Sequence, residues 1–358
     1  MRTLHLLASA ERRGAEVFGT ELARRLEALG HTGEVVALSG SGASSALDVE
    51  VLPALRSATA ARALRQRARS ADVVLGHGSH GLVGGTIATF ASRTPLVYRS
   101  IGDPTYWGAS WSRRNRVRLQ LRRAAAVTAL WPAAGEAISR QYGVRPDDIE
   151  IIPNAVDEAW FRVATPEERA AARAELGVDP SVSVVLYLGA LSSEKRVDRV
   201  IAATAQVPGA HLVVAGDGPE RDRVAGLAGE SLAGRHHLLG AVDDVRPLFA
   251  AADVALLLSA TEGQPGVAIE AGLSGLPLVA TDVGGVSSVV SSGETGVLVG
   301  PDADPDEAAA AIVAALADRA AMGAAAHQRC SKMFTFATVA ERYDALLRQV
   351  VATPRRSD

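Results

Sequence analysis

The sequence predicts an α/β protein of two domains, each built on a parallel sheet with crossover helices. Its 358 residues exceed what a single hydrophobic core usually holds. Short β-branched or leucine-rich runs alternate with alanine-rich helical stretches, the pattern typical of parallel sheets. The alternation breaks near residues 154–165, where we place the hinge. We expect an N-terminal domain over residues 1–158, a C-terminal domain over 159–335, and a last helix within 336–358 that packs back on the N-terminal domain.

Strand candidates recur in both halves, which makes each half Rossmann-like. Gly30 follows the helical stretch 15–29 and is a good C-terminal cap for the first crossover helix. Helical spacing of apolar residues predicts the final helix over Thr338–Val351. The strand candidates are Thr3–Ala8, Glu34–Leu38, Val73–Gly76, Leu96–Arg99, Val127–Leu130, Ile149–Ile152, Val182–Leu188, His211–Ala215, His237–Leu239, Val254–Leu258, Pro277–Ala280 and Gly296–Val299.

The composition is that of a globular protein, with 48% hydrophobic residues, 22% charged residues and a net charge of −3. The single cysteine, Cys330, excludes an internal disulfide and suits a reducing compartment, so we expect a cytoplasmic protein. No apolar run reaches the roughly eighteen residues of a membrane span, and the amino terminus indicates a buried strand rather than a secretory signal. Because only 4% of residues are aromatic, we expect no nucleic-acid partner.

Two glutamates, Glu262 and Glu270, flank a Gly-Gln-Pro-Gly turn directly after the apolar run Ala255–Leu258. The strand should end near Ser259 and a helix should begin at Pro265 or the residue after it, because proline suits the first helical turn. Glu262 would then lie in the loop and Glu270 in the first or second helical turn. Both would lie at the carboxyl edge of the sheet, where α/β proteins bind ligands.

The start of this expected helix has the chemistry of an anion site. Free amides at a helix start attract anions, and Gly263 and Gly266 let a ligand approach the backbone closely. Amide donors for phosphate, beside carboxylates for hydroxyls or a developing cation, suggest a sugar nucleotide. An ordinary strand-to-helix turn with surface acids is the alternative.

Lys195 lies in a second such turn, which begins at Gly189 after the strand candidate Val182–Leu188. A glycine at a strand end followed by a basic residue before a helix is a phosphate cradle. The chain holds only two lysines, and a compact ammonium at this position suits a phosphate site. A solvated lysine at a helix start is the alternative. Gly216 and Val242 lie in further turns on this sheet edge. No G-x-G-x-x-G motif follows a strand, which argues against a dinucleotide-binding site.

In the first half, polar residues and a glycine also follow strand candidates. Arg12 and Gly14 come after the first strand, His77 after the third, and Arg99 and Asp103 after the fourth. Strand-end placement makes them candidates for binding a second substrate. A plain turn and a structural histidine are the alternatives.

The run Trp111–Arg123 contains six arginines. The first interpretation of such a segment is a solvated helix face. The alternatives are a binding site for an anionic acceptor, or a peripheral contact of Arg113–Arg123 with the inner face of a membrane.

Taken together, these pieces resemble the retaining glycosyltransferases of family 4, which have the GT-B fold of two Rossmann-like domains facing across a cleft. Each motif alone is weak, but five motifs occur in the right order and cover nearly the whole chain. They are Gly14-Ala15-Glu16, Ile152–Asp157, Gly189–Lys195, Gly216–Pro219 and the pair Glu262 and Glu270, which is similar to the family's E-x7-E signature.

Three residues depart from the family pattern. Ala155 replaces a usual glycine, and Ala190 stands where the family commonly has an arginine that grips the donor diphosphate. Losing that charged hydrogen bond would cost about 1.5–3 kcal/mol, and our hypothesis is that Arg196 or Arg99 compensates. Arg99 also occupies the place where many members have a histidine, so the role of that histidine does not carry over.

The resemblance implies a transferase that moves a hexosyl-type group from a nucleotide-diphosphate sugar to a hydroxyl of a glycan, lipid or small molecule. It implies retention of anomeric configuration, no cofactor and no metal. Alternatives are a sugar-nucleotide epimerase of the same fold and a non-catalytic partner subunit. The implied catalytic residues are Glu262, Lys195 and Arg99. Implied donor-binding residues are Gly189, Lys195, Arg196, Gly216, Val242, Gln264, Pro265, Gly266, Val267 and Glu270, and implied acceptor-binding residues are Arg12, Gly14, His77 and Asp103.

Overall fold

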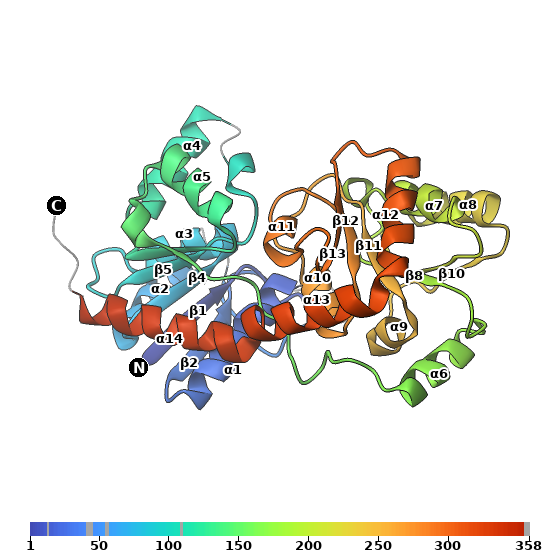
Figure 1. Cartoon of the computed structure of the whole chain (residues 1–358). Coiled ribbons are helices and arrows are strands. Elements are labelled where there is room, and N and C mark those ends of the chain that lie inside the picture. Colours follow the sequence, from blue (N-terminus) through green and yellow to red (C-terminus); the bar gives the residue numbers. More distant parts are fainter. Residues whose placement is uncertain (13, 41–45, 54–56, 108–109, 354–358) are drawn as a thin grey trace. The chain divides into compact units, whose positions relative to one another are not determined.

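The computed structural model of the protein describes residues 1–12, 14–40, 46–53, 57–107 and 110–353. Contacts divide the chain into two compact units, which Figure 1 shows. Unit 1 comprises Met1–Ala155 and Phe336–Asp358, and unit 2 comprises Val156–Thr335.

Unit 1 is built on a parallel sheet with the strand order β3-β2-β1-β4-β5-β6-β7. Apolar residues on both faces of the central strands explain why this sheet is buried between helices. The two-residue strand β3 was not predicted, because both of its residues are exposed and carry no apolar pattern. The strands are β1 (Arg2–Leu7), β2 (Thr32–Ala37), β3 (Glu50–Val51), β4 (Val73–His77), β5 (Leu96–Arg99), β6 (Ala126–Ala129) and β7 (Ile149–Ile151).

Helices cover both faces of this sheet. Helices α2 to α5 share one apolar cluster with the sheet, and α1 and α14 share another on the opposite face. In Figure 1, α4 and α5 lie on the side of the sheet away from α14. The helices of unit 1 are α1 (Gly14–Ala28), α2 (Ala58–Ser70), α3 (Gly78–Ala88), α4 (Trp111–Leu121), α5 (Pro132–Tyr142) and α14 (Phe336–Ala352), with short 3-10 turns η1 (Pro104–Tyr106) and η2 (Pro146–Asp148).

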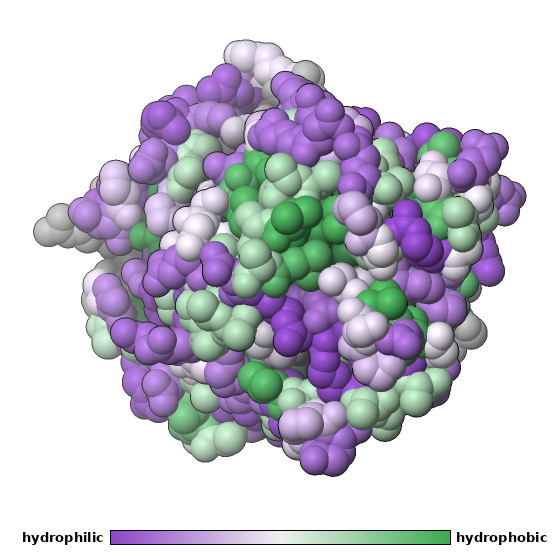
Figure 2. All heavy atoms as spheres, turned by 45° about the vertical axis from the view of Figure 1, so that its right-hand side comes forward, coloured by the Kyte–Doolittle hydropathy of each residue, from purple (hydrophilic) through white to green (hydrophobic). Residues whose placement is uncertain are grey.

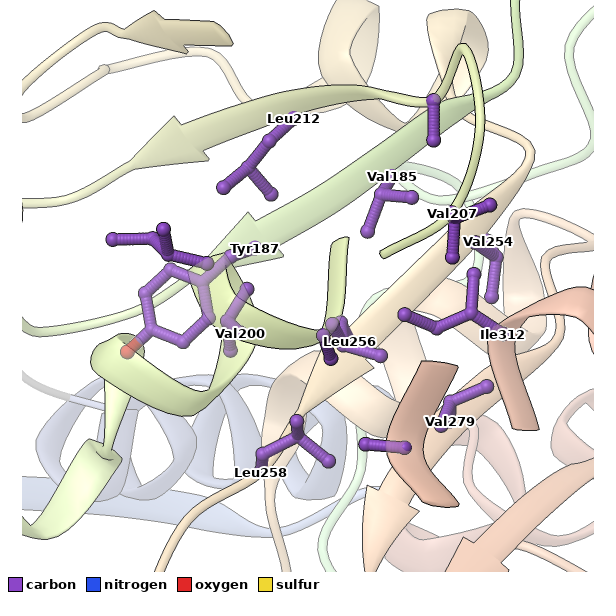
Figure 3. Close-up of a cluster of buried hydrophobic side chains, with 14 of the residues drawn as sticks. Val185, Tyr187, Val200, Val207, Leu212, Val254, Leu256, Leu258, Val279 and Ile312 are labelled. Atoms are coloured by element: carbon purple, nitrogen blue, oxygen red, sulfur yellow. The ribbon is translucent and has the colours of Figure 1, made fainter. Parts of the chain in front are cut away.

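Unit 2 repeats the plan with a parallel sheet of order β10-β9-β8-β11-β12-β13. Figure 3 shows part of its larger core, where Tyr187, Leu212 and Leu256 lie among aliphatic side chains of neighbouring strands and helices. The strands are β8 (Val184–Leu188), β9 (His211–Ala215), β10 (His236–Leu238), β11 (Val254–Leu257), β12 (Leu278–Thr281) and β13 (Gly296–Val299). Every strand predicted from the sequence is therefore present within about two residues at each end, and the predicted α/β class is confirmed.

The helices of unit 2 also lie on both faces of its sheet. Helices α7, α8 and α12 contribute to one apolar cluster, and α9, α10, α11 and α13 to the other. They are α6 (Pro166–Glu175), α7 (Val197–Ala205), α8 (Arg221–Leu232), α9 (Arg246–Ala251), α10 (Gly266–Leu273), α11 (Val286–Val289), α12 (Pro305–Ala317) and α13 (Arg319–Met333), with the 3-10 turn η3 (Ser193–Lys195).

The chain leaves unit 1 at Ala155 and returns to it at Phe336. Val156 bridges to Thr335 and its amide donates to the Phe334 carbonyl at 3.0 Å, which ties it to unit 2. The division thus falls three residues before the boundary expected at 158. In unit 1, α14 packs on α1, with the Phe18 and Phe336 ring centroids 5.3 Å apart.

Most of the face shown in Figure 2 is hydrophilic, and the hydrophobic residues there gather in patches. In the part of the chain that the structure describes, no single helix is long and apolar enough to cross a membrane. Helices α12 and α13 pass that test of length and composition only as a pair bent by 86°.

Candidate active site

The connection between β11 and α10 places both glutamates as the sequence predicted. Strand β11 is fully buried and apolar, and α10 begins at Gly266 with Pro265 as its extended N-cap residue. Glu262 therefore lies in the loop, and Glu270 lies in the second turn of the helix.

Lys195 and Glu262 form the central ion pair of this site. Lys195 Nζ lies 2.7 Å from Glu262 Oε1, and the Ser259 hydroxyl donates to the same oxygen at 2.7 Å. The side chain of Glu262 is 7% exposed and that of Lys195 is 24% exposed. Two donors hold the carboxylate in one orientation, while the ammonium keeps access to a ligand.

These residues line a cavity of about 320 Å³. It lies at the carboxyl ends of β8 and β11, where loops and the start of α10 meet. The structure thus brings together the lysine, both glutamates and the glycine-rich helix start. The lining residues are Tyr187, Leu188, Gly189, Ala190, Lys195, Leu257, Glu262, Pro265, Gly266, Val267 and Glu270.

Glu270 has an unusual electrostatic environment. Burial raises the pKa of its carboxyl group from 4.5 to about 7. Its Oε1 lies only 3.6 Å from the position that a Cβ on Gly266 would take, so the carboxyl group turns back toward the start of its own helix. Near neutral pH this group changes charge, and hydroxyl donors from a ligand would favour the ionised form.

Two glycines are required by close backbone packing around the cavity. Gly216 has φ +141°, and a Cβ there would lie 1.8 Å from the Gly189 carbonyl oxygen. Gly284 has φ +58°, and its Cβ would lie 1.8 Å from the Glu262 carbonyl oxygen. Side chains at either position would displace loops that carry the site.

Arg196 does not line the cavity, contrary to its expected role as a donor ligand. It has a left-handed backbone with φ 48°, and its guanidinium forms two 3.2 Å hydrogen bonds with the Asp198 carboxylate. These bonds direct the cation to the first turn of α7. Compensation for Ala190 by Arg196 would therefore require this pair to break.

Three other expected donor ligands lie outside the cavity lining. Gly216 donates its amide to the Gly240 carbonyl at 2.7 Å, and Val242 packs partly buried against a core cluster. The Gln264 side chain is buried and donates to Ser288 Oγ at 2.8 Å, so it supports the loop before α10.

Arg99 is buried inside unit 1, which corrects the expectation of an accessible strand-end cation. It is 1% exposed, its guanidinium carbon lies 3.6 Å from the centre of the Phe18 ring, and it donates to Asn154 Oδ1. Burial lowers the pKa of Arg99. In this structure the guanidinium holds α1 and the chain before the hinge together, and a direct contact with substrate would require it to move.

His77 is likewise buried rather than open to a substrate. Its Nε2 lies 3.3 Å from His5 Nδ1, and the two rings stack with centroids 5.5 Å apart. Burial, together with His5 and Arg99, holds the pKa of His77 well below its usual value, so the ring is neutral. His77 therefore has the buried environment of a structural histidine, which was the alternative interpretation.

Of the remaining unit 1 candidates, two are exposed and one caps a 3-10 turn. Arg12 and Gly14 are exposed beside the start of α1, and a side chain at Gly14 would meet no atom within 4 Å. Asp103 instead caps η1, where its Oδ1 accepts from the Thr105 amide at 2.8 Å and the Thr105 hydroxyl at 2.7 Å.

Sequence reasoning missed two residues that shape the cavity. Ser259 orients Glu262, and its own carbonyl accepts from the Thr281 hydroxyl at 2.6 Å. The Tyr187 hydroxyl donates to the Ala190 carbonyl at 2.8 Å, which fixes the turn after β8. A polar residue at the end of the apolar β11 run was the available signal for Ser259. Among the described residues, no group of three or more His, Cys, Asp or Glu is arranged to hold a metal ion.

Two family models match the chain. The model described as Glycosyltransferase Family 4 matches residues 12–160, and the one described as Glycosyl transferases group 1 matches residues 182–318. The two matches fall in units 1 and 2 respectively, apart from the last five residues of the first.

Relatives of known function and structure are similar over much of the chain. It is 29% identical to alpha-maltose-1-phosphate synthase of Mycolicibacterium smegmatis, over 95% of this chain and 96% of that protein. It is 36% identical to D-inositol 3-phosphate glycosyltransferase of Segniliparus rotundus, a match spanning 45% of this chain and only 38% of that relative. Crystal structures of HepE from Anabaena share 26% identity; the complex with UDP has a TM-score of 0.87, covering 98% of this chain and 100% of HepE. HepE has also been solved with UDP-glucose.

Proposed function

The chain belongs to glycosyltransferase family 4, and from that premise we propose that it moves a hexosyl-type group from a nucleotide-diphosphate sugar to an acceptor hydroxyl. The observation that carries this proposal is the cavity in unit 2 that combines the Lys195–Glu262 pair, Glu270 and the open start of α10. The UDP and UDP-glucose complexes of HepE support a nucleotide-sugar donor.

In the proposed donor complex, Glu270 accepts hydrogen bonds from the ribose hydroxyls. Backbone amides of Gln264, Gly266 and Val267, together with the Lys195 ammonium, hold the diphosphate, since a helix start and a cation both favour negative charge. Lys195 is the only lysine in the cavity lining. Ala190, in the same lining, adds no second cation beside it.

The proposed transfer retains anomeric configuration. The bond from the anomeric carbon to the leaving phosphate oxygen breaks, and the acceptor oxygen forms a bond to the same face of that carbon. The departing phosphate takes the acceptor proton, so no separate base is needed. Lys195 and the amides stabilise charge on the leaving phosphate, and Glu262 stabilises the oxocarbenium-like centre.

We propose that the reaction needs no metal. Lys195 and the amides at the start of α10 supply the positive field that a cation would otherwise provide. We place the reaction in the cytoplasm, where nucleotide sugars would be the donors. Acceptor binding is assigned to unit 1, with Arg12 and Gly14 as the exposed candidates and Arg99 and His77 as positioning residues.

One observation favours a second function, a non-catalytic sugar-nucleotide-binding subunit. Ala190 removes a family arginine, and neither Arg196 nor Arg99 is free to replace it, because one pairs with Asp198 and the other is buried. Such a subunit would bind donor but would not turn it over.

A two-step assay separates these functions. A thermal-shift screen of nucleotide diphosphates identifies the base, and mass spectrometry of reactions with the matching sugar nucleotides and an acceptor panel identifies products. We expect a glycosylated acceptor, with activity unchanged by EDTA, and Glu262→Ala should lower turnover at least a hundredfold. An isomerised donor without acceptor would indicate an epimerase, and binding without turnover would indicate the non-catalytic subunit.

A further inference from the structure

Helix α4 presents an outer face that unit 1 leaves uncovered. Leu121 is its only buried residue, and the helix touches the rest of the unit through α3 and α5. Trp111 is 81% exposed and Leu119 is 66% exposed. Large apolar side chains with this exposure on a helix of mostly polar residues need an explanation beyond core packing.

The same helix concentrates positive charge. Arg113, Arg114, Arg116, Arg118, Arg122 and Arg123 are all exposed, and the segment 111–123 contains no acidic residue. In the described part of the chain, Arg113, Arg116 and Arg118 form no ion pair. Their charges are therefore available to a partner, although the protein as a whole has a net charge of −3.

The apolar and basic residues are arranged in strips. At about 100° per residue, Trp111, Asn115 and Leu119 follow one another along the outer side of the helix. Arg118 lies on one side of this line and Arg116 on the other. At the C-terminal end, the Arg123 guanidinium lies 5.1 Å from the ring centre of Phe90, another exposed apolar residue. Arg113 and Arg114 lie away from this line, and the Arg114 guanidinium donates to the Gln141 carbonyl at 3.3 Å. We call Trp111, Leu119, Phe90, Arg116, Arg118, Arg122 and Arg123 the α4 face.

We propose that the α4 face binds the surface of an anionic lipid bilayer. Tryptophan and leucine insert at the headgroup level, while arginines beside them keep their guanidinium groups at the lipid phosphates. A duplex nucleic acid would engage the arginines but would gain nothing from an exposed leucine. The cavity that holds the candidate active site contains no residue of α4, so this binding does not rest on the proposed transfer reaction.

Flotation of the full chain with vesicles tests the proposal. We expect binding to vesicles that contain phosphatidylglycerol, none to vesicles of phosphatidylcholine alone, and release by high salt. The triple variant Arg116→Gln, Arg118→Gln, Arg123→Gln should bind on the order of a hundredfold more weakly, since each arginine near an anionic surface contributes about fivefold. The double variant Trp111→Ala, Leu119→Ala should also bind more weakly, while keeping the salt dependence.

A matched control removes the same charge elsewhere. Arg24, Arg223 and Arg348 are exposed and lie outside α4, so their triple glutamine variant should bind vesicles as the native chain does. Circular dichroism melts confirm that each variant folds. Equal binding to both kinds of vesicle, or equal losses in the two arginine variants, would overturn the proposal. Tight duplex DNA binding that survives the Trp111 and Leu119 changes would also overturn it.

Discussion

Replacing Lys195 with alanine removes the cation of the candidate active site and tests its role most sharply. The ammonium lies 2.7 Å from Glu262 Oε1, and the Glu262 side chain is only 7% exposed. The change therefore also leaves a nearly buried carboxylate that still accepts from the Ser259 hydroxyl. One hydrogen bond with a charged partner contributes about 1.5–3 kcal/mol. Because Lys195 is itself 24% exposed, we expect a loss in unfolding free energy at or slightly below the lower end of that range, about 1–2 kcal/mol.

The loss in catalysis should exceed the loss in stability. A donor that stabilises developing charge contributes about 10²–10³ in rate. We therefore expect kcat/KM of Lys195→Ala to fall at least about a hundredfold, equivalent to roughly 2.7 kcal/mol of transition-state stabilisation. The melting temperature should fall by only a few degrees, as about 1–2 kcal/mol shifts it in a domain of this size.

Initial rates with the identified donor and acceptor, beside thermal melts, measure both effects. The second lysine, Lys332, is exposed on α13 and lies outside the cavity, so Lys332→Ala is the matched control. Near-native turnover in Lys195→Ala would refute the reasoning. An equal loss in the control would do the same.

Three residues around the same cavity give further predictions. Donor affinity should rise with pH through about 7 and level off above it, because ribose hydroxyls donate to the ionised Glu270. In calorimetric titrations, Glu270→Gln should lack this rise, whereas the exposed control Glu341→Gln should keep it. The raised pKa also means that native stability relative to Glu270→Gln falls as pH rises from about 4.5 to about 7, which melts at several pH values would detect. Ser259→Ala should lower kcat several-fold with little change in donor affinity, and a pure loss of affinity would contradict its orienting role. Gly216→Ala should disrupt donor binding more than the open-site change Gly14→Ala, and equal donor affinities in the two variants would count against close packing at Gly216.

The fold and the unit 2 site followed from local patterns. Strand ends, glycines and Pro265 lie next to one another in sequence. Parallel strands place their carboxyl ends on one sheet edge, so the sequence predicted that Lys195 and Glu262 lie close together. The Arg196 pairing was missed although Asp198 is only two residues away, because the left-handed backbone at Arg196 sets its direction.

The burial of Arg99 and His77 has a non-local cause. Placement at a strand end suggested open side chains, but burial depends on what packs over the strand. Helix α14, more than two hundred residues away in sequence, contributes Tyr343 to the same cluster as Phe18, which lies under Arg99. No pattern of residues within the first half of the sequence could reveal that α14 packs there.

A crystal structure with bound UDP, the nucleotide seen in HepE, would test the central claim most directly. The account predicts diphosphate oxygens within hydrogen-bonding distance of Lys195 Nζ and the amides at the start of α10, with the ribose hydroxyls on Glu270. A nucleotide bound elsewhere, with Lys195 and Glu270 both out of contact, would contradict it.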